Sequence, residues 1–375
     1  MKLISIIDSD RAYGKERANL QVDYIMREHG DKVIILFNKV ADYSIRDEIA
    51  SYDNYEIPFP RNLGGRRYWL KYLLAFFMTQ IKIIRVLRKE KPDYILVPTE
   101  IALSYLIFPL LLTNAKIVFR CGDSPLIFRK HGIIAKTYAF LWKKIILKQV
   151  DIVVSNAKYI QKQIKESGRI QSDKDMLIYN FPPVREMKRD SATYKNHPNT
   201  LRIGFMGRIV EDKGVRELIL AISKINQSGE KVVAYICGDT SVDKEYTDEL
   251  FKISDKSIEY VGLINDLDRF YDHVDIVCIP SIYPEPMANV VTEAKYHKKA
   301  VIIFNLGGMP EIVEHKQTGY ICSEVTVDSL AAGINYYIKN PLLIKEHGDN
   351  AYQSIMELGL TEQIFTEKWL NVFSN

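Results

Sequence analysis

The sequence predicts an α/β protein built from two doubly wound parallel sheets. Short apolar, β-prone runs alternate with helical patterns along the chain, and this alternation is typical of parallel strands joined by helices. The length of 375 residues suits two domains. A polar stretch over residues 195–200 separates two series of strands. We therefore expect one domain over 1–190, a second over 200–360, and a last helix over 361–375.

The first domain is expected to hold strands over residues 3–7, 33–37, 94–97, 117–120 and 152–155. The first apolar run is followed at once by Asp8 and Asp10, which indicates a strand and not a signal peptide. Basic helical patterns cover 66–91 and 136–148. The apolar run over 101–112 is too short to span a membrane, so we expect a buried helix there.

The second domain is expected to hold strands over residues 201–206, 232–237, 258–261, 276–280 and 301–304. Ligands of open α/β sheets bind outside the carboxyl ends of the strands. The loops that follow these strands are therefore where we look for a site.

Two carboxylates, Glu285 and Glu293, flank the predicted start of a helix after the strand over 276–280. Pro286 suits the first position of a helix, so free N–H groups near residues 287–289 would form an anion site. Carboxylates accept hydrogen bonds from sugar hydroxyls. The segment predicts a sugar, a diphosphate and a ribose bound in a row, although each glutamate alone could be an ordinary surface residue.

A second motif follows the strand over 201–206, where Gly207 and Gly214 bracket a loop that contains Arg208 and Lys213. Arginine clamps phosphate through two hydrogen bonds, and lysine acts as a point charge. The loop matches neither the dinucleotide fingerprint G-x-G-x-x-G nor the P-loop. It therefore favours phosphate binding of another kind, with two ordinary surface cations as the plain alternative.

Together, in this order, the two motifs resemble glycosyltransferase family 4, whose members are retaining, nucleotide-sugar-dependent enzymes of the GT-B fold. The resemblance is sharpest over residues 202–319, and weaker segments lie at 151–157 and 178–181. It implies two domains facing a cleft and a final helix that crosses back to the first domain. It also implies retaining hexosyl transfer from a nucleotide-diphosphate sugar to a saccharide or lipid-linked acceptor, in capsule, lipopolysaccharide or glycolipid assembly.

The same resemblance implies a role for each matching residue of the second domain. Arg208 and Lys213, in the loop after Gly207, would neutralise the leaving diphosphate. Glu285 would bind the donor sugar as a positioning and electrostatic group, and Glu293 would bind the ribose. Backbone amides would hold the phosphates and the base, at Met287, Ala288, Asn289 and Val290 for the phosphates and at Val261, Gly262 and Ile264 for the base.

The acceptor side is expected in the first domain, at Gly14 and Arg17 after the first strand and at Arg120 and Asp123 near the fourth. The first of these segments resembles the family's first glycine loop, with one glycine where many relatives have two. Relatives often carry a histidine near the second segment, and this chain has none there. Arg120 or Asp123 could replace it, or neither does, since Asp123 could be a plain turn residue.

Charge is distributed unevenly along the chain. Residues 1–190 hold 33 Lys and Arg against 21 Asp and Glu, and the remainder holds 18 against 26. The excess peaks over residues 57–150, with 17 basic residues and 4 acidic ones. The helices over 66–91 and 136–148 could therefore contact anionic lipid at the inner membrane face of the cytoplasm. They could equally pack on the sheet with their lysines in water. No recognisable nucleic-acid-binding signature accompanies the charge.

No metal or other cofactor is expected. Asp8 and Asp10 form an Asp-x-Asp pair that could hold magnesium, but they lie far in sequence from the phosphate motifs. The seven histidines form no cluster, and His297 is expected on a helix surface. The four cysteines show no close pair, which suits a reducing cytoplasm.

Other functions stay open. An epimerase of the same architecture would bind the nucleotide in a similar way but needs acid and base residues around the sugar. A sugar-nucleotide-binding or membrane-recruited module would bind without turnover, and the missing histidine keeps that reading open. A nicotinamide oxidoreductase would need the glycine fingerprint that the chain lacks.

Overall fold

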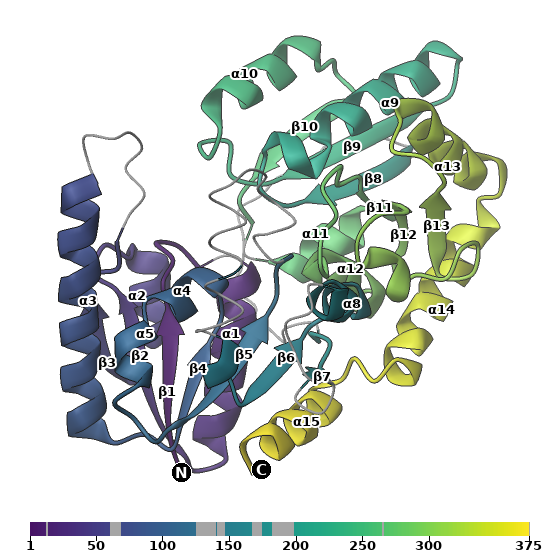
Figure 1. Ribbon diagram of the computed structural model, residues 1–375. Coiled ribbons are helices and arrows are strands. Elements are labelled where there is room, and N and C mark those ends of the chain that lie inside the picture. The colour runs from purple at the N-terminus through teal and green to yellow at the C-terminus, as the bar shows by residue number, and fades with distance from the viewer. Residues whose placement is uncertain are drawn as a thin grey trace. The chain divides into compact units, whose positions relative to one another are not determined.

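The computed structural model describes residues 1–12, 14–60, 69–124, 140, 147–166, 175–181, 199–264 and 266–374. The chain divides into two compact units (Figure 1). The first comprises Met1–Tyr179 with Gln363–Asn375, and the second comprises Asn180–Glu362. The division falls ahead of the polar stretch over 195–200, most of which lies outside the described residues.

The first unit contains a parallel sheet of seven strands in the order β3-β2-β1-β4-β5-β6-β7. The strands are β1 (Lys2–Ile7), β2 (Lys32–Asn38), β3 (Asp53–Ile57), β4 (Tyr94–Val97), β5 (Lys116–Cys121), β6 (Ile152–Ser155) and β7 (Asp175–Leu177). The central strands are buried on both faces, as in sheets that helices cover on both sides. Successive strands run from β1 to β3 in one direction, and the chain then returns to place β4 on the other side of β1.

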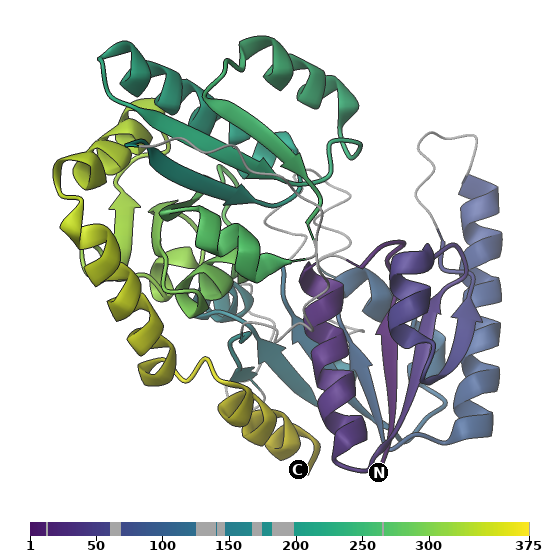
Figure 2. The same ribbon diagram turned by 180° about the vertical axis from the view of Figure 1, so that it is seen from behind.

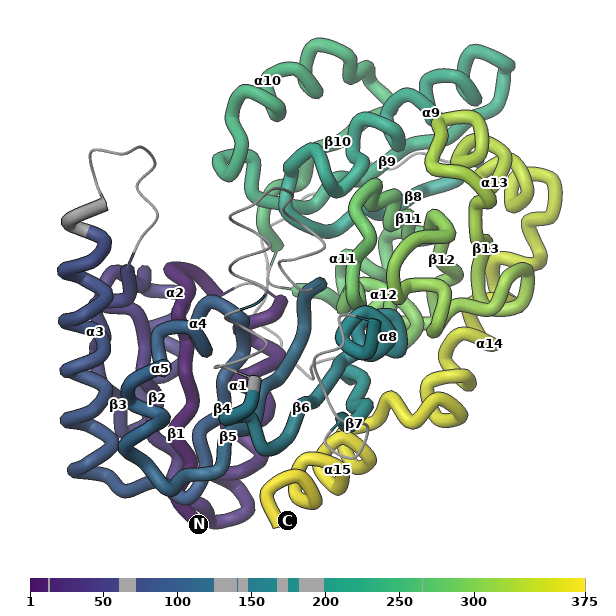
Figure 3. The backbone as a smooth tube through the Cα atoms, viewed as in Figure 1, coloured from purple at the N-terminus to yellow at the C-terminus, as the bar shows by residue number. Residues whose placement is uncertain are grey.

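Helices of the first unit lie on both faces of this sheet, as the two opposite views show (Figure 1, Figure 2). They are α1 (Gly14–Glu28), α2 (Tyr43–Ile49), α3 (Trp69–Glu90), α4 (Glu100–Ser104), α5 (Ile107–Leu110), η3 (Leu147–Gln149), α8 (Lys158–Glu166) and α15 (Glu362–Ser374). The last of these follows the second unit in the chain yet packs on the first (Figure 3). Its Phe373 ring lies edge-on to Tyr94, with centroids 5.2 Å apart.

The second unit contains a parallel sheet of six strands in the order β10-β9-β8-β11-β12-β13. The strands are β8 (Leu201–Met206), β9 (Val232–Cys237), β10 (Ile258–Gly262), β11 (Ile276–Ile279), β12 (Ala300–Phe304) and β13 (Gly319–Cys322). Their helices are η5 (Glu211–Lys213), α9 (Val215–Gln227), α10 (Lys244–Ile253), α11 (Leu267–His273), α12 (Asn289–Tyr296), η6 (Met309–Glu311), α13 (Val327–Lys339) and α14 (Leu342–Glu357). The prediction of two doubly wound parallel sheets is confirmed.

Gly204 shows how closely the layers of the second unit approach. A Cβ at this position in β8 would lie 2.9 Å from the ring of Phe270 on α11. The alternate residues of the same strand, Ile203 and Phe205, enter the core under α9 and α13. A central strand in a sheet covered on both faces thus needs a small residue where a helix presses on it.

The apolar run over 101–112 does not form the single buried helix that we expected. It forms α4 and α5, and Ile101, Phe108, Leu111 and Leu112 are exposed. Proline has no N–H and is tolerated only in the first turn of a helix. A new helix therefore starts at Ile107 and places Pro109 in its first turn.

Other expectations need smaller corrections. Three strands were not predicted, namely β3, β7 and β13. The helix expected over 136–148 lies almost wholly outside the described residues, and the described residues 147–149 form η3. All four cysteines are buried at strand positions or strand ends. No helix among the described residues is long and apolar enough to cross a membrane.

Candidate functional site

The second sheet has a topological switch point between β8 and β11. From β8 the chain proceeds to β9 and β10 on one side, and it then returns to add β11, β12 and β13 on the other. From these two neighbouring strands the chain therefore continues toward opposite ends of the sheet, and in open α/β sheets this is where ligands bind. Both sequence motifs lie in these two loops.

The loop after β8 is fixed against the loop after β11. Gly214 adopts a left-handed conformation with φ +68°, and a Cβ there would lie 1.8 Å from the carbonyl oxygen of Pro280. The backbone N–H groups of Ile282 and Tyr283 both donate to the carbonyl of Asp212, at 3.0 and 3.3 Å. Only glycine satisfies both the conformation and the approach at position 214. These contacts therefore hold the loop after β8 and the loop after β11 together.

This arrangement brings Lys213 and Glu285 into contact. The Lys213 ammonium lies 2.9 Å from Oε1 of Glu285, and both side chains are largely buried, with 19% and 13% exposed. The hydroxyl of Ser281 donates to the same carboxylate oxygen. The backbone of Glu285 is fixed as well. Its carbonyl oxygen accepts a hydrogen bond from the N–H of Gly308 at 2.8 Å, and a Cβ at Gly307 would collide with this oxygen. Arg208 in the same β8 loop is exposed.

Helix α12 starts three residues later than we expected. Pro286 lies in a bend before it, and Ala288 is the N-cap residue with no side-chain cap. Pro286, Met287 and Ala288 are buried. The first-turn amides of the helix are therefore those that begin at Asn289 and Val290, and Met287 and Ala288 precede its first turn. The side-chain oxygen of Asn289 accepts a 2.8 Å hydrogen bond from Asn180.

Glu293 lies on the buried side of α12 and not on its surface. The Tyr271 hydroxyl donates to its carboxylate at 3.4 Å. His297, expected on a helix surface, is instead half-buried and stacks on the Tyr271 ring with centroids 4.3 Å apart. Burial lowers the pKa of His297, against the opposing influence of Asp268.

The proposed base-binding loop lies at the end of β10, two strands from β8. Val261, Gly262 and Ile264 are half-buried. Gly238, which the sequence did not single out, links this strand end to β8. Its N–H donates to the Gly262 carbonyl at 3.0 Å, and a Cβ there would lie 2.1 Å from the Gly207 carbonyl oxygen. A glycine directly after an apolar strand was the available signal for it.

Lys295 is a second residue that sequence reasoning missed. It lies one position beyond Ala294 on α12, its side chain is fully buried, and its ammonium donates to the carbonyl of Ile312. Burial lowers the pKa of Lys295 to about 8, although Glu314 and Glu357 oppose this effect. The lysine thus ties the helix of the Glu285 motif to the segment after Gly307 and Gly308.

The first sheet also has a switch point, between β1 and β4, and a cavity of about 220 Å³ lies there. The loops after β1, β4 and β5 line it, with Asp8, Lys15, Thr99 and Asp123 as its main polar groups. Thr99 donates to Asp8 at 2.9 Å, and the Lys15 ammonium lies 3.8 Å from Asp123. Burial raises the pKa of Asp8, opposed by Lys15 and by the hydrogen bond from Thr99.

The other residues expected on the acceptor side lie away from this cavity. Gly14 begins α1, and Arg17 on the same helix pairs with Glu48 at 3.3 Å. The side chain of Arg120, a residue of β5, is buried. It donates to the side chain of Asn19, and its guanidinium carbon lies 5.9 Å from the ring centroid of Trp369 on α15.

Asp23 is buried in the same region as Arg120. Burial lowers the pKa of Arg120 to about 10, and it raises the pKa of Asp23 to about 7. Asp10 is not among the cavity-lining residues and accepts from Asn38 at 3.1 Å. The cavity therefore contains Asp8, Lys15 and Asp123, and the Arg120 guanidinium belongs to the core.

Comparisons with known proteins agree with this architecture. Residues 186–354 match the family described as glycosyl transferases group 1. The capsular polysaccharide biosynthesis glycosyltransferase CapM of Staphylococcus aureus is 26% identical over 212 residues, covering 56% of this chain and 53% of CapM. The poly(ribitol-phosphate) alpha-N-acetylglucosaminyltransferase of Staphylococcus aureus is 27% identical over 236 residues, covering 61% of this chain and 47% of that protein. The chain thus spans about half the length of these curated relatives.

Among solved structures, Anabaena HepE in complex with UDP is similar over the full length of both chains, with a TM-score of 0.79 and 18% sequence identity. A glycosyltransferase from Rickettsia africae has the same TM-score and 18% identity, covering 99% of this chain and 97% of that one. At this level of identity, the likeness establishes the two-domain GT-B fold.

Proposed function

We propose that the protein is a glycosyltransferase that moves a sugar from a nucleotide-diphosphate sugar to a saccharide or lipid-linked acceptor in cell-surface polysaccharide assembly. The Lys213–Glu285 pair, placed at the switch point of the second sheet, carries the proposal. It joins a phosphate-binding cation to a carboxylate suited to sugar hydroxyls. The family match over residues 186–354 and the names of the relatives support the same function.

In this proposal Lys213 serves two partners. An ammonium has three N–H donors, so one can remain on Glu285 while another reaches a phosphate oxygen. Arg208, exposed in the same loop, would clamp the diphosphate, and the first-turn amides of Asn289 and Val290 would add helix-end donors. Positive charge fixed before the reaction would stabilise the negative charge that grows on the leaving diphosphate.

The remaining parts of the donor follow the edge of the sheet. Glu285 would accept hydrogen bonds from the sugar, and Glu293, held by the hydrogen bond from Tyr271, would accept hydrogen bonds from the ribose. The backbone at Val261, Gly262 and Ile264 would hold the base, next to Gly238 and Gly207. The base loop after β10, the diphosphate loop after β8 and Glu285 after β11 follow the strand order β10-β9-β8-β11, while Glu293 lies further along, on α12.

We infer a retaining reaction of the family 4 type without a metal ion. The bond from the anomeric carbon to the diphosphate oxygen breaks, and the acceptor oxygen bonds to the same face of the sugar. The acceptor proton passes to the leaving diphosphate. The cations and the helix end perform the charge neutralisation that a divalent cation performs elsewhere.

The cavity of the first unit is the acceptor site in this proposal. Asp8 and Asp123, two of its three carboxylates beside Glu100, would accept hydrogen bonds from acceptor hydroxyls, and Phe119 and Pro98 provide apolar walls for a sugar ring. The acceptor would be a cytoplasmic saccharide or the head of a lipid at the membrane face. Asp123 would then take the position where relatives often carry a histidine.

A thermal-shift assay tests the donor site. The protein is mixed with UDP, GDP or ADP, with and without EDTA, at about 100 times the dissociation constant, where binding adds about 2.7 kcal/mol of stability. We expect one nucleotide to raise the melting temperature, with or without EDTA. Lys213→Gln should weaken binding by about 1.5–3 kcal/mol, or tenfold to more than a hundredfold. Lys231→Gln, an exposed lysine of the same unit, should leave it unchanged.

Loss of the ion pair could disturb folding by itself, so the double variant Lys213→Gln/Glu285→Gln is measured in parallel. This variant leaves two neutral partners in place of the pair and should still fold but bind nucleotide weakly. Wild-type nucleotide binding by a folded Lys213→Gln variant would refute the phosphate assignment. A shift abolished by EDTA would refute the metal-free site. Asp123→Asn should raise the KM for acceptor and leave the nucleotide shift intact.

A further inference from the structure

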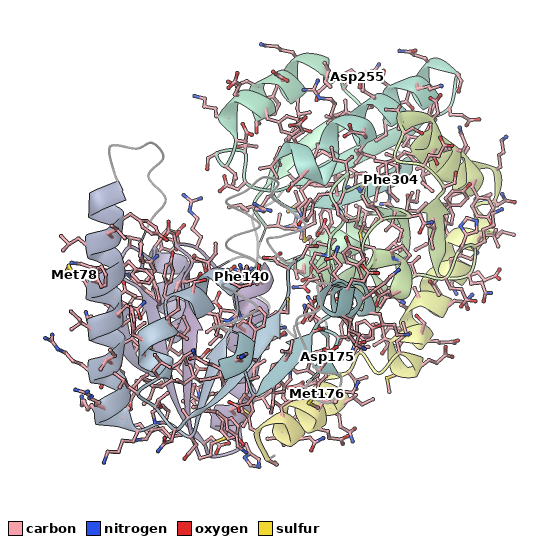
Figure 4. The ribbon with its side chains drawn as sticks, viewed as in Figure 1. Met78, Phe140, Asp175, Met176, Asp255 and Phe304 are labelled. Atoms are coloured by element: carbon pink, nitrogen blue, oxygen red, sulfur yellow. The ribbon has the colours of Figure 1, made fainter. Side chains whose placement is uncertain are left out.

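The outer face of α3 is divided into an apolar half and a cationic half. Leu74, Phe77, Met78 and Ile81 recur at helical spacing, and each is between 49% and 63% exposed. Lys82, Arg85 and Arg88 continue the same stripe toward the end of the helix and are exposed as well. Met78 points away from the sheet (Figure 4). Core helices normally turn such an apolar stripe inward.

A second helix extends the apolar half. Helix α5 packs beside α3, and the N–H of Phe108 donates to the side chain of Gln80 at 3.4 Å. Phe108 is 46% exposed, and Leu111 and Leu112 after α5 are 66% and 55% exposed. Exposed apolar residues that occur singly need no explanation, but several on two helices that pack side by side mark an interaction surface.

The cationic half has no acidic residue beside it on α3. The only acid among the described residues of the helix, Glu90, is buried and accepts a 2.6 Å hydrogen bond from the Tyr55 hydroxyl. That hydrogen bond, with Lys32 and Lys2, lowers the pKa of Glu90 against the opposing effect of burial. The charged side chains described on the outer face of α3 are therefore all cations. The surrounding segment is basic too, with 17 Lys and Arg against 4 Asp and Glu over residues 57–150.

We propose that the outer face of α3, with Phe108, Leu111 and Leu112, is a docking surface for an anionic lipid bilayer. The apolar half would enter the headgroup region while the cations contact lipid phosphates, with the helix lying in the plane of the interface. This names a partner beyond the donor and the acceptor of the proposed function, and it does not depend on the donor site.

A second copy of the chain is a poorer occupant. Two α3 helices packed in parallel would set Lys82 and Arg85 against the same cations of the partner, and like charges repel. Packed antiparallel, the cationic half of each helix would lie on the apolar half of the other and would desolvate charge without a partner. An anionic bilayer satisfies both halves at once.

Vesicle co-sedimentation tests the surface with the full-length chain. Vesicles of phosphatidylcholine alone are compared with vesicles that also contain phosphatidylglycerol, at low and high salt. We expect binding to the anionic vesicles, weakened as salt screens the charges. Lys82→Glu/Arg85→Glu should weaken partitioning by at least about fivefold for each cation removed. Met78→Glu/Ile81→Glu should weaken it by about tenfold or more.

Matched controls lie in the second unit. Met356→Glu on α14, 68% exposed, and Lys339→Glu on α13 repeat the same substitutions on other helices and should leave vesicle binding unchanged. Nucleotide thermal shifts should survive in every variant, which separates this surface from the donor site. The proposal is overturned if wild-type protein ignores anionic vesicles, or if the controls lose binding equally. It is also overturned if Met78→Glu dissolves a dimer in sedimentation velocity.

Discussion

The two switch points share one topology and differ in how their loops pack: each places a lysine beside a carboxylate, but a cavity lies at that of the first unit. In the second unit the loops after β8 and β11 meet directly, with Lys213 on Glu285 and the start of α12 beside them. In the first unit the corresponding loops after β1 and β4 are joined by the hydrogen bond from Thr99 to Asp8, and a cavity remains whose charged groups are Asp8, Lys15, Glu100 and Asp123. In our proposal the first of these two edges binds the anionic diphosphate, and the second binds the hydroxyls of the acceptor.

The contrast continues beneath the surface. The first unit buries an acid, Asp23, whose pKa is raised to about 7, and the second buries a base, Lys295, whose pKa is lowered to about 8. A parallel sheet supplies the place for a site through its strand order, and the loop residues decide what binds there. The position of a site in such a fold can thus be read from topology, while its ligand must be read from the side chains.

The largest expected effect tests whether the β8 and β11 loops must touch. In Gly214→Ala the new Cβ would collide with the Pro280 carbonyl and would also require a left-handed alanine. We expect a loss of about 3 kcal/mol or more in the stability of the second unit, with nucleotide binding abolished. Amide hydrogen exchange of β8 measures the stability of that unit.

Gly229→Ala is the control for Gly214→Ala, since Gly229 also has a positive φ, of +99°, but open space around its Cα. It isolates the backbone strain, about 1 kcal/mol, from the collision. All three tryptophans, residues 69, 142 and 369, lie outside the second unit, so their fluorescence should not change in either variant. Equal losses in the two variants would show that the loop contact is dispensable.

A smaller effect concerns the buried acid of the first unit. The pKa of Asp23 rises from 3.8 to about 7 on folding. Its contribution to stability is therefore fully present below pH 4 and is lost as the pH rises through 7. We expect about 2 kcal/mol of that loss between pH 5 and 7. In Asp23→Asn this part of the pH dependence should vanish in urea unfolding followed by tryptophan fluorescence. An unchanged slope would contradict the burial of the acid.

The smallest effect should have the opposite sign in the second unit. The pKa of Lys295 falls from 10.5 to about 8, so its contribution is present above pH 10.5 and is lost as the pH falls through 8. We expect the second unit to gain on the order of 1 kcal/mol between pH 8 and 9.5, and Lys295→Met to remove that gain. Hydrogen exchange of α12 at the two pH values measures it. A gain that persists in Lys295→Met would assign the effect to another group.

Sequence patterns were sufficient for the strands whose residues are buried on both faces. The strands over 94–97, 152–155, 201–206 and 232–237 lie where the apolar runs placed them. The strands β3, β7 and β13 lie at sheet edges, where the pattern is no longer continuously apolar, and they were not predicted, whereas the edge strand β10 was. Residues 101–112 form two helices because of Pro109, whereas the hydropathy of this segment favours one.

Candidate site residues could be predicted from the sequence only where charged side chains occur at a characteristic spacing. Arg208, Lys213, Glu285 and Glu293 were singled out from spacing, and their roles stay predictions. The sequence does not show how deeply a side chain is buried. Arg120 was therefore expected beside the acceptor and His297 on a helix surface, whereas the first is buried and the second is half-buried. Their surroundings come from α15 and α11, which approach from distant parts of the sequence. The start of α12 was misplaced because Pro286 also suits the bend that precedes the helix.

Helix α15 has a consequence for how the molecule is made. Its Trp369 and Phe373 fill the core of the first unit, although the helix leaves the ribosome only after the whole of the second unit. A nascent chain that stops anywhere before Trp369 leaves Arg120 and Tyr94 without the rings that cover them. The second unit can therefore complete its core during synthesis, and the first unit, though translated first, is the last to be finished.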